Sequence, residues 1–190
     1  MTKMIMNQGE RILVKAGGNC VIEKFAIREP NPDEVLIETV SSLISAGTEL
    51  GNQEVSRSDF HPGYSNAGRI IAVGKDVRGL SIGDRVLSLG NHASHVTVPA
   101  KPEEVALIPD NVSFDHASFG VLGSVAINGV RKAKIELGEF VAISGMGLVG
   151  QLTLQLASQT GCESLIATDF CDLRLRIAKE LGATHICNLQ

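Results

Sequence analysis

A glycine-rich segment, Gly145-Met146-Gly147-Leu148-Val149-Gly150, has the residue types and the spacing of a phosphate-binding loop. It directly follows the short apolar segment Phe140–Ser144 and opens a helix predicted over Leu148–Ser158. In this spacing the first glycine permits a tight turn, the second lets the backbone approach a pyrophosphate, and the third lets the helix pack closely on the strand. The free N–H groups and the dipole at the helix start favour an anion. The segment therefore predicts a dinucleotide-binding β-α-β unit.

An acidic residue, Asp169, ends the next predicted strand, at the offset of about 20 residues expected for the acid that binds the adenosine ribose. A carboxylate accepts hydrogen bonds from the ribose hydroxyls and repels a 2′-phosphate. Because Phe170 and Cys171 follow, and not Arg or Lys, the sequence favours NAD over NADP. The alternative is a packing turn that binds no nucleotide. The predicted cofactor-binding residues are Gly145, Gly147, Leu148, Val149, Gly150 and Asp169.

The elements that position these residues change in pattern near residue 113. Before it, short segments rich in Val and Ile alternate with Gly, Pro, Asn and Asp, which predicts a small β-barrel or sandwich. The predicted strands are Arg11–Lys15, Cys20–Arg28, Glu34–Ser41, Ala67–Val73, Asp84–Ser88, Ser94–Pro99 and Val105–Ile108.

After residue 113 the pattern becomes an alternation of helices and strands. Ser113 is predicted to cap one helix that runs toward Ala133, and Gly182 is predicted to follow the C-terminus of the last helix. The alternation predicts a parallel sheet with right-handed crossovers. A doubly wound sheet has two such halves, and about one is present, so we expect a fragment or a covered sheet edge. Besides those above, the predicted elements are Ser164–Asp169, Asp172–Leu181 and His185–Asn188.

The composition is that of a soluble, globular protein: 190 residues, 44% hydrophobic and 20% charged. The formal net charge is −4 and Lys and Arg are not clustered, which argues against a nucleic-acid or membrane-surface partner. The N-terminal segment does not resemble a secretory signal, so a cytoplasmic location is expected. The four cysteines, which form no C-x-x-C pair, are expected to be reduced thiols: Cys20, Cys162, Cys171 and Cys187.

Taken together, several segments resemble the medium-chain dehydrogenase/reductase superfamily over essentially the whole chain. The resemblance implies an α/β fold with an N-terminal β-barrel: a GroES-like alcohol dehydrogenase-type domain over residues 1–120 and the first half of a Rossmann NAD-binding domain over residues 121–190. It also implies an oxidoreductase with a small-molecule substrate, and a homodimer, since members often pair through the Rossmann sheet edge. Besides the glycine loop, the segments are Pro32–Ile37, Ala67–Gly74, Gly83–Val86 and Ala178–Ala183.

The resemblance departs from the zinc-dependent members at each expected ligand. Their C-G-T-D motif, which carries a catalytic Cys, corresponds to Ala46–Glu49, and their G-H-E-x-x-G motif corresponds to Gly63–Gly68. Ala46, Tyr64 and Ser65 thus replace the ligands of these motifs, and a further ligand would fall near Val121. These side chains do not supply the donors that zinc needs, so no zinc is expected.

A zinc-type alcohol dehydrogenase with a displaced metal site is an alternative, with the five histidines as substitute ligands. We interpret them instead as solvated loop residues, and a substrate contact by His61 is also considered. Glu49 is read either as a carboxylate beside the catalytic hydroxyls or as a solvated side chain. The five histidines are His61, His92, His95, His116 and His185.

Within the superfamily, Ser45–Glu49, Gly63–Ser65 and Leu122–Arg131 look like the zinc-lacking branch with the bacteriochlorophyllide dehydrogenase-like proteins. They look even more like the N-terminal half of bidomain oxidoreductases, in which a glucose–fructose oxidoreductase-type module follows. The expected reaction is NAD(H)-dependent and zinc-independent, on an alcohol, a carbonyl or an activated alkene. The candidate catalytic hydroxyls are Thr48, Tyr64 and Ser65, whose structural alternatives are a turn Thr, a packed Tyr and a turn Ser. A non-catalytic nucleotide-binding module is the rival hypothesis.

Overall fold

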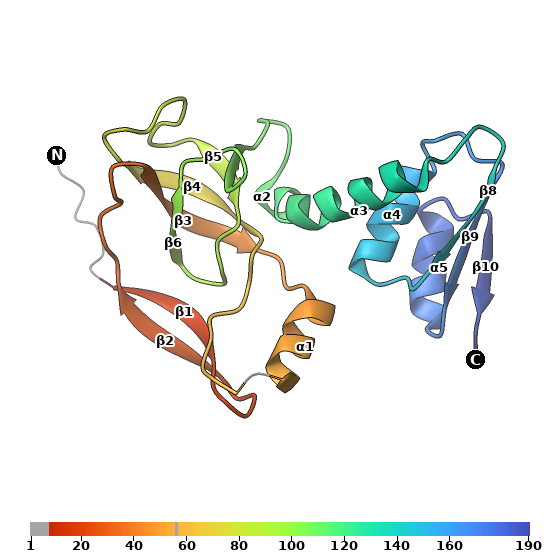
Figure 1. Cartoon of the computed structure of the whole chain (residues 1–190), viewed down its shortest axis with the longest axis horizontal. Helices are drawn as coiled ribbons and strands as arrows, with labels where there is room; N and C mark the ends of the chain where they lie inside the picture. Colours follow the sequence, from red (N-terminus) through yellow and green to blue (C-terminus); the bar gives the residue numbers. More distant parts are fainter. Residues whose placement is uncertain (1–7, 56) are drawn as a thin grey trace. The chain divides into compact units, whose positions relative to one another are not determined.

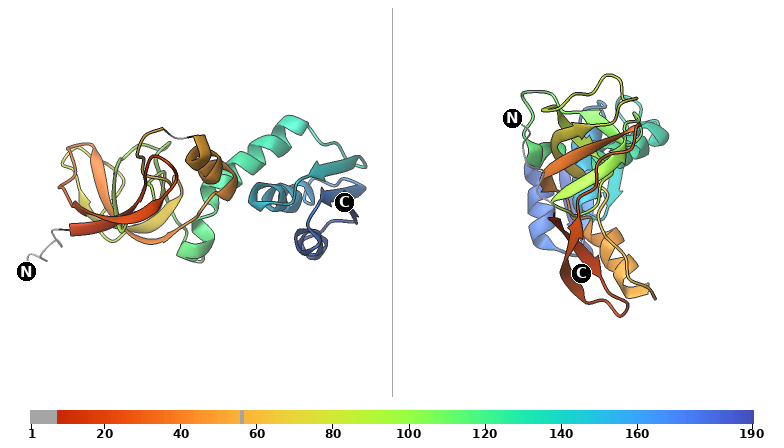
Figure 2. Two further views of the ribbon diagram at one scale, coloured as in Figure 1. Left: turned by 90° about the horizontal axis from the view of Figure 1, so that it is seen from below. Right: turned by 90° about the vertical axis from the view of Figure 1, so that its left-hand side faces the viewer.

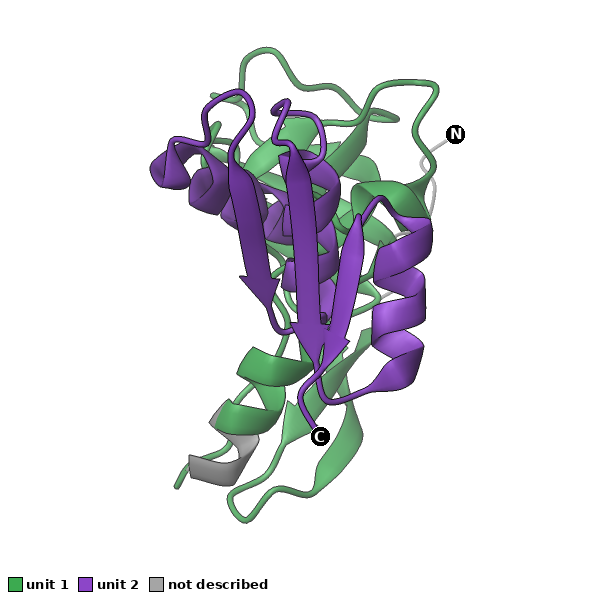
Figure 3. Ribbon diagram, turned by 90° about the vertical axis from the view of Figure 1, so that its right-hand side faces the viewer, with its two compact units in different colours: residues 1–120 green, residues 121–190 purple. Residues whose placement is uncertain are grey.

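The computed structural model describes residues 8–55 and 57–190. The chain divides into two compact units between Gly120 and Val121, which Figure 3 distinguishes by colour. No helix among the described residues is long and apolar enough to cross a membrane.

The first unit is built on a five-stranded antiparallel sheet in the order β6-β3-β4-β5-β7. Figure 1 labels β3, β4, β5 and β6 of this sheet. A separate hairpin, β1 and β2, is tied to the rest of the unit by isolated bridges from Arg11 to Ala93 and from Val14 to Phe60. The curled strands, seen from two further sides in Figure 2, form the GroES-like half-barrel that the family resemblance implies. The strands are β1 (Gln8–Val14), β2 (Cys20–Ala26), β3 (Glu34–Ser42), β4 (Asn66–Val73), β5 (Arg85–Ser88), β6 (His95–Pro99) and β7 (Val105–Leu107).

The core of this unit explains why the strands form where they do. β-Branched side chains recur at every second position, so they gather on one face of the sheet and leave water together. All seven predicted strands are confirmed, with ends shifted by three residues or fewer. The buried set is Val35, Ile37, Ile70, Val86, Val96, Val98 and Val105.

Two helical segments of the first unit differ from the prediction. A helix that the sequence reading did not expect, α1 (Ala46–Val55), follows β3. The start of this helix is capped from within, because the Glu49 side chain accepts a hydrogen bond from the backbone N–H of Ser45 at 2.7 Å. The periodic patterns that predict the other elements do not mark this helix, which begins at a local cap.

The single helix predicted from Ser113 to Ala133 is wrong. Ser113 does cap a helix, accepting from the backbone N–H of His116, but that helix, α2, spans only Phe114–Ala117. After α2, the Ser118 hydroxyl donates to the carbonyl of Asp115. A separate helix, α3, then spans Gly120–Ala133. Between the two helices the Phe119 N–H donates to the carbonyl of His116, a bond of the 3₁₀ type, and Gly120, at which α3 begins, has a low helix propensity.

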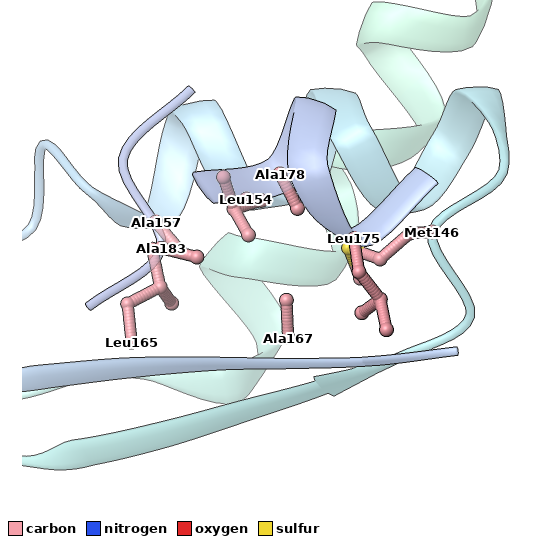
Figure 4. Close-up of a cluster of buried hydrophobic side chains, with 8 residues drawn as sticks. All are labelled: Met146, Leu154, Ala157, Leu165, Ala167, Leu175, Ala178 and Ala183. Carbon is pink, nitrogen blue, oxygen red and sulfur yellow. The ribbon is translucent and has the colours of Figure 1, made fainter. Parts of the chain in front are cut away.

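The second unit holds a parallel sheet in the order β10-β9-β8, covered by α4 (Leu148–Ala157) and α5 (Asp172–Glu180). Its strands, β8 (Phe140–Ser144), β9 (Ser164–Asp169) and β10 (His185–Asn188), have the predicted bounds. Figure 4 shows the small core between helices and sheet. Its buried residues are Met146, Leu154, Ala157, Leu165, Ala167, Leu175, Ala178 and Ala183.

Candidate functional site

The glycine loop joins the end of β8 to the start of α4 and is held by backbone contacts. Gly145 has a φ of +88°, a conformation that favours glycine, and its N–H donates to the carbonyl of Thr168 at 2.8 Å. A Cβ atom on Gly150 would lie 1.8 Å from the Gly145 carbonyl oxygen. Gly145 therefore permits the turn and Gly150 the close return of the helix, the two roles that the sequence predicts.

The middle glycine borders open space. Gly147 is the N-cap of α4 and provides no side-chain cap, so the first-turn N–H groups are not satisfied by a capping oxygen. A Cβ on Gly147 would have no heavy atom within 4 Å, and Leu148 and Val149 are each more than a third exposed. Uncapped N–H groups at a helix start, beside a glycine with open space at its Cβ position, form a cradle that suits a phosphate group.

Asp169, at the end of β9, is buried against this loop. One carboxylate oxygen accepts from the backbone N–H of Met146 at 2.6 Å and the other from that of Cys171 at 2.8 Å. The hydrogen bond from Met146 is the main cause that lowers the pKa of Asp169 below its ordinary value. Burial acts in the opposite direction but is the smaller effect. The structure thus joins the acid to the loop it was predicted to serve.

Sequence reasoning missed one charged neighbour of this carboxylate. The guanidinium of Arg174 lies 3.8 Å from Asp169 Oδ2, because the first turn of α5 brings it back to the end of β9. The sequence prediction used only the two residues that follow Asp169, whereas the helical turn brings Arg174, five residues after it, next to the carboxylate. A search one turn into the following helix could have found it.

The three candidate hydroxyls of the first unit lie in different surroundings. Thr48 is exposed in α1, and Tyr64 is half-buried. Ser65 is buried, and its hydroxyl donates to the carbonyl of Ser118 at 2.5 Å. No hydrogen bond joins these three side chains, all of which are described, to one another.

The interpretation of the histidines as solvated loop residues is wrong for two of them. His92 is only 9% exposed at its side chain, where Nε2 lies 2.9 Å from Glu49 Oε2, and His95 is buried on β6, where burial lowers its pKa. The reading of Glu49 as solvated is wrong for the same reason, since its side chain is 12% exposed. The sequence did not reveal the contact between His92 and Glu49, because the two residues are 43 positions apart.

The remaining histidines lie nearer the surface. His116 and His185 are exposed. His61 is half-buried and its Nε2 lies 3.1 Å from Glu23 Oε2. His61 and Arg11 together hold the pKa of the Glu23 carboxyl below its ordinary value.

Comparison with known proteins identifies relatives of this chain. No family model matches it. It is 32% identical over 206 residues to sorbitol dehydrogenase of Bacillus subtilis. The matched region covers 89% of this chain and 58% of that protein. The chain belongs to the medium-chain dehydrogenase/reductase superfamily. It spans about 60% of the length of the curated superfamily relatives that match it over nearly its whole length.

Solved structures of similar fold agree with the two-part architecture. A zinc-binding dehydrogenase from Sinorhizobium meliloti bound to NADP superposes with a TM-score of 0.85 at 22% identity, over 95% of this chain and 62% of that one. A short chain alcohol dehydrogenase from Escherichia coli CFT073, complexed with NADH, has a TM-score of 0.85 at 21% identity, over 97% and 63%. At these identities the likeness shows the fold.

The zinc ligands of the superfamily do not fit the residues present. Ala46, Tyr64 and Ser65 stand where the C-G-T-D and G-H-E motifs place ligands, and Ser65 already donates to a carbonyl. In the part of the chain that the structure describes, no three side chains of His, Cys, Asp or Glu lie close enough to share a metal ion.

Proposed function

We propose that this superfamily member is an NAD(H)-dependent, zinc-independent oxidoreductase for a small alcohol, carbonyl compound or activated alkene. The observation that carries the proposal is the open, uncapped start of α4 at Gly147, with Asp169 bonded to the same loop. It supports cofactor binding by the predicted residues Gly145, Gly147, Leu148, Val149, Gly150 and Asp169.

In this proposal the backbone N–H groups of the first turn of α4 hold the pyrophosphate, because they are donors without an internal partner. Asp169 accepts from the ribose hydroxyls. Its low pKa keeps it a carboxylate, which has only acceptor oxygens for those hydroxyls. When bound, the nicotinamide ring supplies hydride transfer.

The preference for NAD over NADP rests on the balance between two charges. The Asp169 carboxylate repels a 2′-phosphate, while the Arg174 guanidinium, 3.8 Å from it, would attract one. Asp169 is buried beside the loop, whereas the Arg174 side chain is 56% exposed and its charge is screened by water. We therefore infer that the carboxylate decides and that NAD is preferred.

Zinc independence is inferred from the donor set, since alanine has no donor atom and the hydroxyl of Ser65 is occupied. Of the three candidate catalytic hydroxyls, Thr48 and Tyr64 remain available to a substrate oxygen, and the bond from Ser65 to Ser118 argues for a structural role. The likeness of several segments to the zinc-lacking branch and to bidomain oxidoreductases supports the same proposal. We also propose a cytoplasmic location and a small-molecule substrate.

The experiment is a fluorescence titration of the complete gene product with NADH. The Gly147→Ala variant fills the cradle without a steric clash within the chain, so we expect it to fold normally and bind NADH at least about tenfold more weakly. Gly129→Ala is the matched control, because Gly129 also has open space around its Cβ position but lies in α3. No saturable change in the parent protein, or equal binding by Gly147→Ala, would refute the cofactor site.

Parallel titrations with NADPH test the cofactor preference. NADPH should bind more weakly than NADH to the parent protein, and the gap should narrow in Asp169→Asn. Metal analysis of the purified protein tests zinc independence: a stoichiometric zinc ion would overturn it.

A further inference from the structure

A cavity of about 490 Å³ lies in the first unit, beside the free edge of the five-stranded sheet. Residues 95–98 of β6, the edge strand, line it, and so do residues 25–28 at the end of β2 and just beyond it. Among the described strands β2 pairs only with β1, so the edge of β6 next to the cavity has no neighbouring strand. The volume is within the range of roughly 300–1,000 Å³ found for small-molecule sites.

The register between β6 and β3 determines which main-chain groups of β6 are already bonded. The N–H of Thr39, in β3, donates to the carbonyl of Ser94, just before β6, at 2.9 Å, so these two residues form a hydrogen-bonded pair. In an antiparallel ladder such pairs fall at every second residue. The next residues of β6 that bond to β3 are therefore Val96 and Val98.

The residues between them, His95 and Thr97, direct their main-chain N–H and C=O groups away from β3. Within residues 8–55 and 57–190, no backbone group bonds to these donors and acceptors. Pro99, at the next position of this kind, fits the same register, because a proline without an N–H is tolerated where its nitrogen faces a free sheet edge. An edge with unpaired donors and acceptors can pair with another extended segment.

The charged side chains that line the cavity favour an anion. Two arginines and two histidines are among them, and none is a carboxylate. Arg28 is already paired, because both of its terminal nitrogens donate to Glu34. Arg11 donates to Glu23 through Nε alone, at 2.7 Å, and its two terminal nitrogens form no hydrogen bond with the described residues. A guanidinium with this end available suits a carboxylate, which it can bind through two parallel hydrogen bonds.

A buried ring and several apolar side chains complete the lining. His95 is only 7% exposed, and its Nδ1 lies 3.0 Å from Ser94 Oγ, whereas its Nε2 has no hydrogen-bond partner in the described part of the chain. The Arg11 guanidinium lies over the Phe25 ring, 5.0 Å from its centroid, and both residues line the cavity together with Leu36. The cavity thus combines unpaired main-chain groups, one available cation and apolar walls.

We propose that this cavity binds a small peptide-like carboxylate, an N-acylated amino acid with an apolar side chain. The amide of the ligand pairs with the main chain of His95 and Thr97 and so extends the sheet, and its carboxylate binds the terminal nitrogens of Arg11. Its side chain packs against Phe25 and Leu36. Main-chain pairing alone accepts any extended peptide, so the arginine selects for the free carboxylate. Every residue involved belongs to the first unit, so the inference is independent of the cofactor site.

The test is a calorimetric titration of the complete gene product with N-acetyl-phenylalanine. Two analogues separate the two polar contributions, since N-acetyl-phenylalaninamide lacks the charge and 3-phenylpropionate lacks the amide. We expect saturable binding of N-acetyl-phenylalanine, at least about tenfold weaker binding of the uncharged analogue and about three- to tenfold weaker binding of 3-phenylpropionate. Equal affinity for 3-phenylpropionate would indicate a plain anion site and overturn the pairing with the sheet edge.

NMR of protein with ¹⁵N-labelled histidine locates the bound probe. The ring resonances of His95 should shift saturably with N-acetyl-phenylalanine, because this histidine lines the cavity. Those of His116, which does not line it, should stay unchanged. The absence of saturable binding, or His95 resonances that do not respond, would refute the site.

Arg11→Gln tests the carboxylate contact. It should weaken the binding of N-acetyl-phenylalanine at least about tenfold and leave the affinity for N-acetyl-phenylalaninamide unchanged, which also shows that the cavity is intact. Lys15→Gln is the matched control, because Lys15 follows β1, forms a salt bridge with Asp59 and does not line the cavity. An equal loss for both probes in Arg11→Gln would mean that the arginine does not bind the carboxylate.

Thr97→Pro tests the main-chain pairing. It removes an N–H that β3 does not use, as Pro99 does two residues later, so we expect this variant to fold. Its affinity for N-acetyl-phenylalanine should fall by about three- to tenfold, while its affinity for 3-phenylpropionate should not change. Thr97→Val, which keeps the N–H and loses only the hydroxyl, is the matched control. An affinity of Thr97→Pro equal to that of the parent would refute pairing with the sheet edge.

Discussion

In each unit there is a glycine at which an added Cβ would collide with neighbouring atoms. The two cases differ in how far along the chain the colliding residue lies. In the second unit, a Cβ on Gly150 would meet the carbonyl oxygen of Gly145, five residues earlier. In the first unit, a Cβ on Gly63 would meet the backbone and ring of His92, 29 residues later in the chain. One site is encoded within a single turn, whereas the other exists only after distant strands have paired.

This difference shows which kind of site a sequence reveals. A local site has a fixed spacing, because its geometry is a property of one strand, one turn and one helix. The contact between Glu49 and His92 has no spacing to recognise. Glu49 comes from α1, and His92 comes from the segment before β6, whose backbone bonds to Pro62 and Ile12. Substitutions that attack each support separately can break or sharpen this comparison.

The largest expected effect is that of Gly150→Ala. The added Cβ would lie 1.8 Å from a backbone oxygen, which cannot move aside as a side chain can, so α4 must shift away from β8. We expect a loss of about 3 kcal/mol in the free energy of unfolding and loss of NADH binding. Thermal unfolding and NADH titration measure both. A melting temperature equal to that of the parent would show that the loop is not as tightly closed as described.

Gly63→Ala attacks the first unit in the same way. The φ of Gly63 is +99°, and the new Cβ would press on both the backbone nitrogen and the ring of His92. We expect a loss of about 2 kcal/mol, from backbone strain and a displaced histidine. The ¹⁵N resonances of His92 should change, while NADH binding persists. A variant with parent-like His92 resonances would contradict the role of Gly63 as its support.

How much was predictable follows the same division. The bounds of β8, β9 and β10, the cap at Ser113 and the roles of Gly145 and Gly150 follow from rules that act within a few residues. The break after Ala117 and the helix α1 were missed, because the bond from the Phe119 N–H to His116 and the bond that Glu49 accepts from the Ser45 N–H leave no periodic pattern in the sequence. The burial of His92 could not be predicted, because its partners Glu49 and Ser42 lie 43 and 50 positions away in the sequence.

Asp169→Asn tests the link between the acid at the end of β9 and the glycine loop of the second unit. Loss of the charge weakens the hydrogen bonds from Met146 and Cys171, at a cost of about 1–2 kcal/mol at neutral pH. In the parent, the carboxyl pKa lies below its ordinary value of 3.8 in the folded chain. Its stabilising contribution is therefore present above the unfolded pKa and is lost as the pH falls through the lower folded pKa.

Urea unfolding at several pH values between about 2 and 7 checks this prediction. The difference in stability between the parent and Asp169→Asn should be constant at neutral pH and shrink in acid. Asp172→Asn is a suitable control, because Asp172 starts α5 and its side chain accepts from Asn188, whereas the Met146 N–H donates to Asp169. A difference that grows in acid would mean that the carboxylate does not gain from its contacts in the folded state.

The smallest expected effect is that of Gly182→Ala, where only backbone conformation is at stake. Gly182 follows α5 with a φ of +116°, and its N–H and that of Ala183 bond back to the carbonyls of Lys179 and Ala178. The nearest atom to a new Cβ would be Ser158 Cβ at 3.5 Å, an ordinary contact. The cost should be about 1 kcal/mol, the strain of a left-handed alanine, with NADH binding and the His92 resonances unchanged. Gly182→Asn should recover part of this loss, because asparagine tolerates the left-handed region better than alanine does. If Gly182→Ala costs as much as Gly150→Ala, backbone conformation and not steric collision is what makes glycine necessary in this unit.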